Sequence, residues 1–145
     1  TYSEPLIHFE WICETSEKAS KAGLKNIMIT NGHINKNSGI EILKYVDAVN
    51  IDLKAFNERF YYNELGGKLQ PVLDFIATCV ETDNVHTEIT TLIIPGKNDS
   101  LEEIKEAGAF ISSLVKNIPW HLSAYYPAYN YSIPPTSALH LIHIA

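Results

Sequence analysis

The residues best suited to chemistry lie in an alternating segment at positions 48–54. Successive side chains of a strand point to opposite faces, so Asn50, Asp52 and Lys54 share one face and the apolar residues between them share the other. A carboxylate accepts hydrogen bonds from hydroxyl groups, and an ammonium is a mobile positive charge. Inside a barrel of parallel strands, a polar face of this kind lines the mouth where ligands bind. The segment therefore predicts a site for a polar ligand.

Other polar residues follow the remaining expected strands. In parallel α/β folds, ligands bind beyond the carboxyl ends of the strands, so these side chains should meet at one end of the sheet. Glu4 belongs to the same group because it precedes a helix, where a loop leaving an earlier strand would lie. The candidate site residues are Glu4, Thr30, Asn31, Asp52, Lys54, Thr90, Tyr126 and Tyr129.

Each candidate also has an ordinary structural interpretation. Asp52 and Lys54 can form only a salt bridge, and Glu4 can be only a negative charge at a helix start. Thr90 has the β-branched side chain common in strands, and the two tyrosines can simply pack. The six histidines show no helical metal spacing, so no metal site is expected, although His33 follows Thr-Asn-Gly directly and is a further candidate.

The order of the elements predicts an α/β fold with a parallel sheet. The expected strands are 26–30, 48–54, 87–94 and 121–126, and the expected helices are 5–22, 38–45, 56–65, 69–81 and 101–115. Ser38 with Glu41, and Ser100 with Glu103, have the spacing of capping boxes at two helix starts. Repeated βα units form parallel sheets with right-handed crossovers. A closed barrel needs about eight strands, so four strands make an open or partial barrel.

Composition limits the class of protein. The 145 residues are 46% hydrophobic and 19% charged, which is typical of one globular domain, and the net charge of −6 argues against nucleic acid as a partner. No apolar run can span a bilayer and no signal peptide is recognised, so we expect no membrane partner and a cytoplasmic location. Cys13 and Cys79 lack metal-ligand spacing and are expected to be small buried hydrophobes.

The ends of the chain bear on its organisation. The sequence starts at Thr1 without a methionine and ends abruptly at Ala145, so we expect a fragment of a longer protein. Residues 1–145 are expected to form a single truncated domain. Within it, residues 127–145 are expected to be a loosely built C-terminal extension, because Pro127, Pro134 and Pro135 interrupt regular structure there.

Five motifs together resemble a known family. They are Tyr2-Ser3-Glu4-Pro5, Thr30-Asn31-Gly32, Asn50-Ile51-Asp52-Leu53-Lys54, Thr91-Leu92-Ile93-Ile94-Pro95-Gly96-Lys97-Asn98-Asp99 and Pro119-Trp120-His121-Leu122-Ser123. Their order and spacing resemble those of radical S-adenosylmethionine proteins, in the AmmeMemoRadiSam-system branch, which is similar to pyruvate formate-lyase activating enzymes. The resemblance covers almost the whole chain. It implies a partial β/α barrel of six parallel strands, of which this chain holds the last four βα units.

The resemblance implies two cofactors, S-adenosylmethionine and a [4Fe-4S] cluster. The cluster is held in the family by a Cys-x-x-x-Cys-x-x-Cys loop after the first strand. That loop is absent here, so the cluster ligands are not in this chain and the isolated chain is expected to be inactive.

For S-adenosylmethionine the resemblance implies a role for every candidate. Glu4, at the acidic position of the family's Gly-Gly-Glu motif, would accept hydrogen bonds from the methionine ammonium. Thr30 and Asn31 would contact the methionine end or the ribose. Asp52 and Lys54 would face the ribose hydroxyls and the methionine carboxylate. Thr90 occupies a position where activating enzymes often place a cation. Tyr126 and Tyr129 would flank the adenine.

The function implied for the full-length protein is that of a radical S-adenosylmethionine enzyme. An electron donor would supply one electron through the cluster, and reductive cleavage would give a 5′-deoxyadenosyl radical that abstracts hydrogen from a protein or small-molecule substrate. One alternative is a degenerate, non-catalytic half barrel that binds a nucleoside or a partner, which the missing cysteines favour. Another is a Schiff-base aldolase using Lys54, which is disfavoured because Asp52 on the same face would keep the amine charged.

Overall fold

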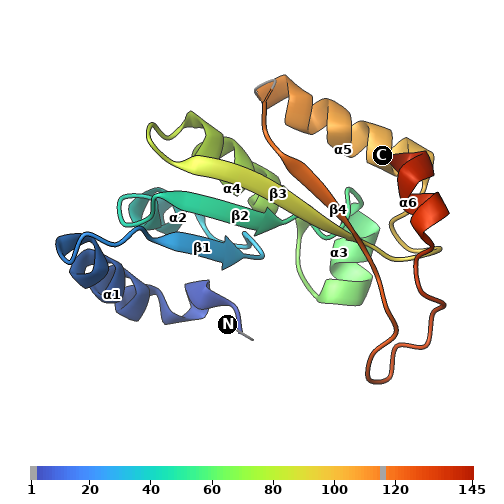
Figure 1. Ribbon diagram of the computed structural model, residues 1–145, viewed down its shortest axis with the longest axis horizontal. Helices are drawn as coiled ribbons and strands as arrows, with labels where there is room; N and C mark the ends of the chain where they lie inside the picture. Colours follow the sequence, from blue (N-terminus) through green and yellow to red (C-terminus); the bar gives the residue numbers. More distant parts are fainter. Residues whose placement is uncertain (1–2, 115–116) are drawn as a thin grey trace.

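A parallel sheet of four strands, in the spatial order β1-β2-β3-β4, forms the centre of the computed structural model (Figure 1). The strands are β1 (Ile27–Thr30), β2 (Ala48–Asp52), β3 (His86–Ile93) and β4 (Trp120–Ala124). The helices are the 3-10 helix η1 (Pro5–His8), α1 (Phe9–Lys21), α2 (Lys36–Ile42), α3 (Glu58–Leu65), α4 (Leu69–Glu81), α5 (Leu101–Leu114) and α6 (Ala138–Ile144). The structure describes residues 3–114 and 117–145; Tyr2 of the first motif and Val115 at the end of an expected helix lie outside them.

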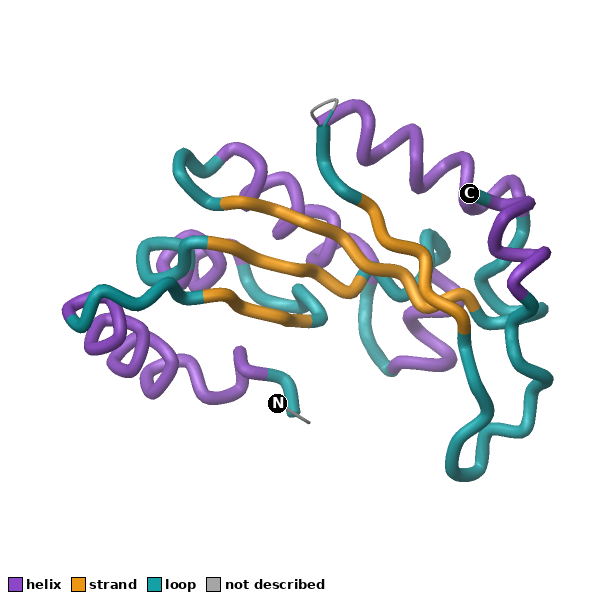
Figure 2. Tube along the Cα trace, viewed as in Figure 1, coloured by secondary structure: helices purple, strands orange, loops and turns teal. Residues whose placement is uncertain are grey.

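Every neighbouring pair of strands is parallel and consecutive in sequence. Ile29 of β1 lies beside Asn50 of β2, which lies beside Glu88 of β3, and Thr90 of β3 lies beside His121 of β4. Helices separate each strand from the next (Figure 2). The α/β class and the partial barrel of parallel strands that the sequence predicts are confirmed.

Buried and partly exposed side chains alternate along β2, as the sequence predicts. On β2, Val49 and Ile51 are buried, whereas Asn50 and Asp52 are partly exposed. The buried face packs against the helices in the main hydrophobic core, and the members of that core with least exposure are Ile42, Val49, Ile51, Leu53, Val72, Ile76, Cys79 and Ile89. On the other face of β1, Ile27 and Ile29 are exposed. Burial of one face thus fixes which side chains of each strand are left for a ligand.

Helix starts differ from the sequence prediction at two places. Asn35 caps α2, because its side-chain oxygen accepts the backbone N–H of Ser38 at 3.0 Å, so the capping box of Ser38 with Glu41 is wrong. Glu41 instead pairs with Lys44. At α5 only half of the second box is formed. The Ser100 hydroxyl accepts the N–H of Glu103 at 3.2 Å. The Glu103 carboxylate instead accepts the backbone N–H of Phe56 at 2.8 Å.

The end of the chain contains a helix that sequence patterning did not reveal. Helix α6 is only seven residues long, which is too short for a clear apolar period. Its Ile144 is buried in a small cluster with Ile93 and Ile104. The Thr136 hydroxyl donates to the carbonyl of Ile93 at 2.6 Å and so fixes the segment before the helix to β3. At the start of the chain, the single helix expected over 5–22 is divided into η1 and α1.

Across the described ranges 3–114 and 117–145, no helix combines the length and apolar character needed to cross a membrane.

Replacement of Gly32 by alanine is expected to destabilise the fold. Gly32 has a φ of +68°, and a Cβ there would lie 2.9 Å from Cγ2 of Ile51 in the core. The left-handed backbone conformation costs about 1–2 kcal/mol for a residue with a side chain, and overpacking the core adds about 1–3 kcal/mol. Urea denaturation, followed by circular dichroism, measures the decrease in the free energy of unfolding.

Gly23→Ala is the matched control. Gly23 also has a positive φ, of +78°, but a Cβ there would meet nothing within 4 Å. The free energy of unfolding should therefore fall by only about 1–2 kcal/mol in Gly23→Ala, the cost of the left-handed conformation alone. Equal losses for the two variants would contradict the close approach of Gly32 to the core.

Candidate functional site

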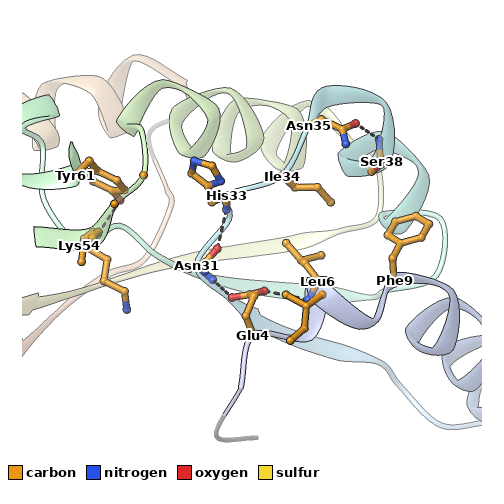
Figure 3. A pocket seen from close by; sticks show the side chains of 14 residues that line it. Glu4, Leu6, Phe9, Asn31, His33, Ile34, Asn35, Ser38, Lys54 and Tyr61 are labelled. Atoms are coloured by element: carbon orange, nitrogen blue, oxygen red, sulfur yellow. Dashed lines mark hydrogen bonds between the residues drawn. The ribbon is translucent and has the colours of Figure 1, made fainter. Parts of the chain in front are cut away.

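A cavity of about 640 Å³ opens at the carboxyl ends of β1 and β2 (Figure 3). Three segments form it: the start of η1 and α1, the loop after β1, and the residues from Lys54 to Gly67. Its polar lining includes Glu4, Asn31 and Lys54, and its apolar lining includes Leu6 and Phe9. Small-molecule sites have volumes of about 300–1,000 Å³ and combine apolar walls with a few polar groups. The cavity has the size and lining of such a site.

The carboxylate of Glu4 joins the N-terminal segment to the end of β1. Its Oε1 accepts the backbone N–H of Leu6 at 3.1 Å and the hydroxyl of Thr30 at 2.5 Å. Its Oε2 accepts the backbone N–H of Asn31 at 2.8 Å. A carboxylate has about four acceptor sites, and the described residues use three of them, which leaves one on Oε2 for a ligand that donates hydrogen bonds. Glu4 is thus both a structural link and a candidate ligand contact.

Thr30 and Asn31 occupy different positions relative to the cavity. Thr30 is only 2% exposed, donates to Glu4 and accepts the N–H of Gly32 at 3.1 Å. It therefore positions Glu4 and does not line the cavity, whereas Asn31 does. The Asn31 side-chain oxygen accepts the N–H of His33 at 2.8 Å, and this bond shapes the turn after β1.

Asp52 and Lys54 form the ion pair that their spacing allows. The Nζ of Lys54 lies 2.8 Å from Oδ2 of Asp52, and both side chains are 38% exposed. The backbone of Lys54 is held on both sides: its N–H donates to the Tyr61 hydroxyl at 3.2 Å, and its carbonyl accepts from Asn98 Nδ2 at 2.6 Å. Lys54 lines the cavity, whereas Asp52 does not. The pair places a positive charge at the cavity with its counter-ion alongside.

Tyr61 is a cavity residue that no sequence motif singles out. It lies on α3, is 3% exposed and lines the cavity beside Lys54. Burial raises the pKa of its phenol to about 12, so the hydroxyl keeps its proton at neutral pH. Its position seven residues after Lys54 matches no motif, and its burial on a short helix is typical of a core residue. Only the fold brings it to the site.

Besides Thr30 and Asp52, three more predicted site residues do not line this cavity: Thr90, Tyr126 and Tyr129. The Thr90 hydroxyl donates to the side-chain oxygen of Asn50 at 2.9 Å, and Thr90 is the neighbour of Asp52 across β2 and β3. Tyr126 and Tyr129 follow β4 and are 79% and 98% exposed. The structure therefore does not bring these tyrosines to Glu4 and Lys54, and their assignment to an adenine stays a prediction.

Two histidines meet one carboxylate on the sheet. The Nε2 atoms of His86 and His121 lie 2.9 and 2.8 Å from the two oxygens of Glu88, and these hydrogen bonds hold the pKa of that carboxyl below its usual value. Over the part of the chain that the structure describes, no group of three histidine, cysteine or acidic residues has the geometry to hold a metal ion. The arrangement is a hydrogen-bonded cluster.

The two cysteines do not fit an iron–sulfur cluster. Such clusters are held by several cysteine thiolates. Cys79 is fully buried on α4, and burial raises the pKa of its thiol to about 12, which keeps it protonated. Cys13 lies on α1, and burial also raises the pKa of its thiol. The described residues therefore supply no ligand set for a cluster.

The sequence is similar to curated proteins that are longer than this chain. It is 37% identical over 142 residues to an uncharacterised protein of Methanocaldococcus jannaschii, covering 94% of this chain and 40% of that protein. It is 24% identical over 125 residues to the pyruvate formate-lyase 1-activating enzyme of Escherichia coli, covering 81% of this chain and 50% of that enzyme. The chain thus spans half or less of the length of these relatives. No protein-family model matches it.

Solved structures share the fold. A domain of the pyruvate-formate lyase-activating enzyme of Bacteroides vulgatus superposes with a TM-score of 0.82 at 20% identity, covering 99% of this chain and 87% of that domain. SuiB of Streptococcus suis, solved with S-adenosylmethionine bound, superposes with a TM-score of 0.75 at 20% identity, covering 98% of this chain and 33% of SuiB. At these identities the likenesses establish the fold.

Tyr61 is expected to ionise near pH 12, whereas an exposed tyrosine ionises near 10. The difference in phenolate absorbance between the chain and its Tyr61→Phe variant should therefore rise near pH 12. In the unfolded chain the same phenol loses its proton near pH 10, so its contribution to the free energy of unfolding is complete below pH 10 and is lost as the pH rises toward 12. A difference signal that rises near pH 10 would contradict the burial of this hydroxyl.

Proposed function

The chain belongs to the activating-enzyme-like branch of the radical S-adenosylmethionine superfamily, and on that premise we propose that its cavity binds the methionine end of S-adenosylmethionine. The observation that carries the proposal is a carboxylate and an ammonium in one cavity, Glu4 and Lys54, with Asn31 drawn between them in Figure 3. An α-amino acid carries the complementary charges. Its ammonium would donate to the remaining acceptor site of Glu4, and its carboxylate would meet Lys54.

The bonds within the chain support this orientation. Glu4 is fixed by donors from three residues, so its open acceptor site has a defined direction. Lys54 is fixed at its backbone by Tyr61 and Asn98, and its ammonium, which carries three donors, can bond an anion while it stays paired with Asp52. Prearranged charges lose less conformational entropy when a ligand binds. The apolar wall at Leu6 and Phe9 would face the methionine side chain.

For the rest of the cofactor, we assign the ribose hydroxyls to Asp52, whose carboxylate accepts hydrogen bonds on the open face of the sheet. Tyr126 and Tyr129 are the candidates for stacking on the adenine, where a flat aromatic face is favourable. Thr90, next to Asp52 on β3, is the candidate for a further polar contact. These contacts would extend the site from β2 toward β4.

In the whole protein, the proposed activity is reductive cleavage of S-adenosylmethionine followed by hydrogen abstraction from a protein or small-molecule substrate. The bound cofactor supplies the reactive adenosyl group, while this chain binds it, orients it and limits the access of water. The iron–sulfur cluster that supplies the electron has no ligands among the described residues, so that step belongs outside this chain. The Escherichia coli relative, an activating enzyme by name, supports this activity.

A second function, ligand binding without catalysis, has one observation in its favour. The two cysteines of the chain fit no cluster, and a half barrel that retains the cavity would still bind a nucleoside or a partner. Schiff-base chemistry at Lys54 is less well supported. It needs an uncharged amine, and Asp52 lies 2.8 Å from the Lys54 ammonium.

Glu4→Gln and Lys54→Met are each expected to weaken the binding of S-adenosylmethionine to the 145-residue chain. Each change removes a charged partner of the ligand, which is worth about 1.5–3 kcal/mol, or roughly tenfold to a hundredfold in the dissociation constant. Isothermal titration calorimetry measures the constants.

Lys25→Met is the matched control for Lys54→Met. Lys25 also pairs with an aspartate, Asp47, at 2.6 Å, but neither residue lines the cavity. Its affinity for S-adenosylmethionine should equal that of the unchanged chain. The proposal would be contradicted if the unchanged chain bound no S-adenosylmethionine, or if the cavity variants and the control had the same affinity.

A further inference from the structure

The hydroxyl hydrogen of Tyr61 has no acceptor in the part of the chain that the structure describes. The hydroxyl oxygen accepts the backbone N–H of Lys54 at 3.2 Å, which uses one of its lone pairs. Its own hydrogen is donated to no described residue. A tyrosine hydroxyl is both a donor and an acceptor, so half of its hydrogen-bonding capacity is unused.

Burial makes the unused donor costly. Tyr61 is only 3% exposed, so solvent reaches little of the residue. A buried donor without a partner costs about 1–3 kcal/mol, and buried tyrosine hydroxyls usually find a hydrogen-bond partner for this reason. Tyr61 lines the cavity at the ends of β1 and β2. An acceptor atom of a ligand in that cavity would satisfy the hydroxyl.

The position of Tyr61 selects the kind of acceptor. Its hydroxyl is anchored to the backbone of Lys54, and the side chain of Lys54 lines the same cavity (Figure 3). Both residues line one cavity, so a single anion bound there has the Lys54 ammonium and the Tyr61 hydroxyl as its available donors. Tyr61 keeps its proton at neutral pH, so it faces an anion as a donor and adds no negative charge. A carboxylate has two oxygens and can accept from both groups at once.

We propose that the Tyr61 hydroxyl donates a hydrogen bond to the carboxylate of the bound amino-acid ligand, and so completes with Lys54 the anion-binding half of the cavity. The inference rests on the proposed function, because it takes the methionine end of S-adenosylmethionine as the ligand. It adds a specificity: Tyr61 distinguishes a ligand with a carboxylate from the same ligand without one.

The test compares S-adenosylmethionine with decarboxylated S-adenosylmethionine, which lacks only the carboxylate. Calorimetry on the 145-residue chain should show tighter binding of S-adenosylmethionine. Tyr61→Phe should weaken the binding of S-adenosylmethionine about tenfold, as loss of a hydrogen bond to a charged group does. The affinity for the decarboxylated ligand should change less than twofold. Tyr62→Phe is the matched control, because Tyr62 is the next residue but is 74% exposed and lines no part of the cavity.

Tyr61 also contacts the backbone of Lys54, so a purely positioning role must be separated from direct contact. If Tyr61 acts only by positioning Lys54, adding Tyr61→Phe to Lys54→Met should cause no further loss of affinity, and that result would overturn the proposal. If Tyr61 contacts the carboxylate, the double variant should bind S-adenosylmethionine more weakly than Lys54→Met alone does. The two variants should have nearly the same affinity for the decarboxylated ligand.

One measurement does not depend on the folding of the Tyr61 variant. Lys54→Met alone should still prefer S-adenosylmethionine over the decarboxylated ligand by about threefold or more, because the Tyr61 hydroxyl remains. Loss of all preference in Lys54→Met would overturn the role of Tyr61 while leaving the proposed function intact. Failure of the unchanged chain to bind either ligand would overturn the proposed function, and this inference with it.

Discussion

The arrangement of the site depends on the hydrogen bonds that converge on the Glu4 carboxylate. The residue precedes the first described helix, yet its oxygens accept from Thr30 and Asn31, more than twenty-five positions later in the chain. These bonds hold the start of η1 against the carboxyl end of β1, and the cavity lies between that segment and the ends of the first two strands. A buried hydroxyl and a backbone amide are good partners for a carboxylate because each lowers the cost of removing the charge from water.

Two hydrogen bonds hold the backbone of Lys54 on the other side of the cavity. The Tyr61 hydroxyl and the Asn98 side chain fix the N–H and the carbonyl of Lys54, so the chain leaves β2 along a defined path. Asn98 is itself almost fully buried and also bonds to Ile94 and Leu92 around the turn after β3. One amide side chain thereby links the ends of two strands. The same residues that satisfy buried backbone groups also set the direction of the charged lysine.

The sequence predicted the fold better than the site. Alternation at 48–54 is a local property, and the buried face of β2 confirms it. Parallel pairing followed from the order of strands and helices. The sequence did not predict the Asn35 cap, because Asn35 and Ser38 are both residue types that cap helices and spacing alone does not rank the two helix starts. Asn35 accepts the N–H of Ser38, whereas a cap at Ser38 would accept the N–H of Glu41. The sequence did not predict Tyr61 as a site residue, because its role depends on a contact with the backbone of Lys54 that only the turn into α3 creates. Tyr126 and Tyr129 were selected for their aromatic rings, but patterning contains no information on how far a loop stands from a cavity.

The central claim is that the cavity at Glu4 and Lys54 holds an amino-acid ligand. Its most direct test is a two-dimensional amide NMR titration of the ¹⁵N-labelled chain with S-adenosylmethionine. The backbone amides of Asn31 and Lys54 donate to Glu4 and Tyr61, so they report directly on both sides of the cavity. The account predicts that these two amides shift strongly, while that of Asn26, at the amino end of β1 and bonded to Asp47, does not. Shifts confined to other parts of the chain, or none at saturating ligand, would contradict it.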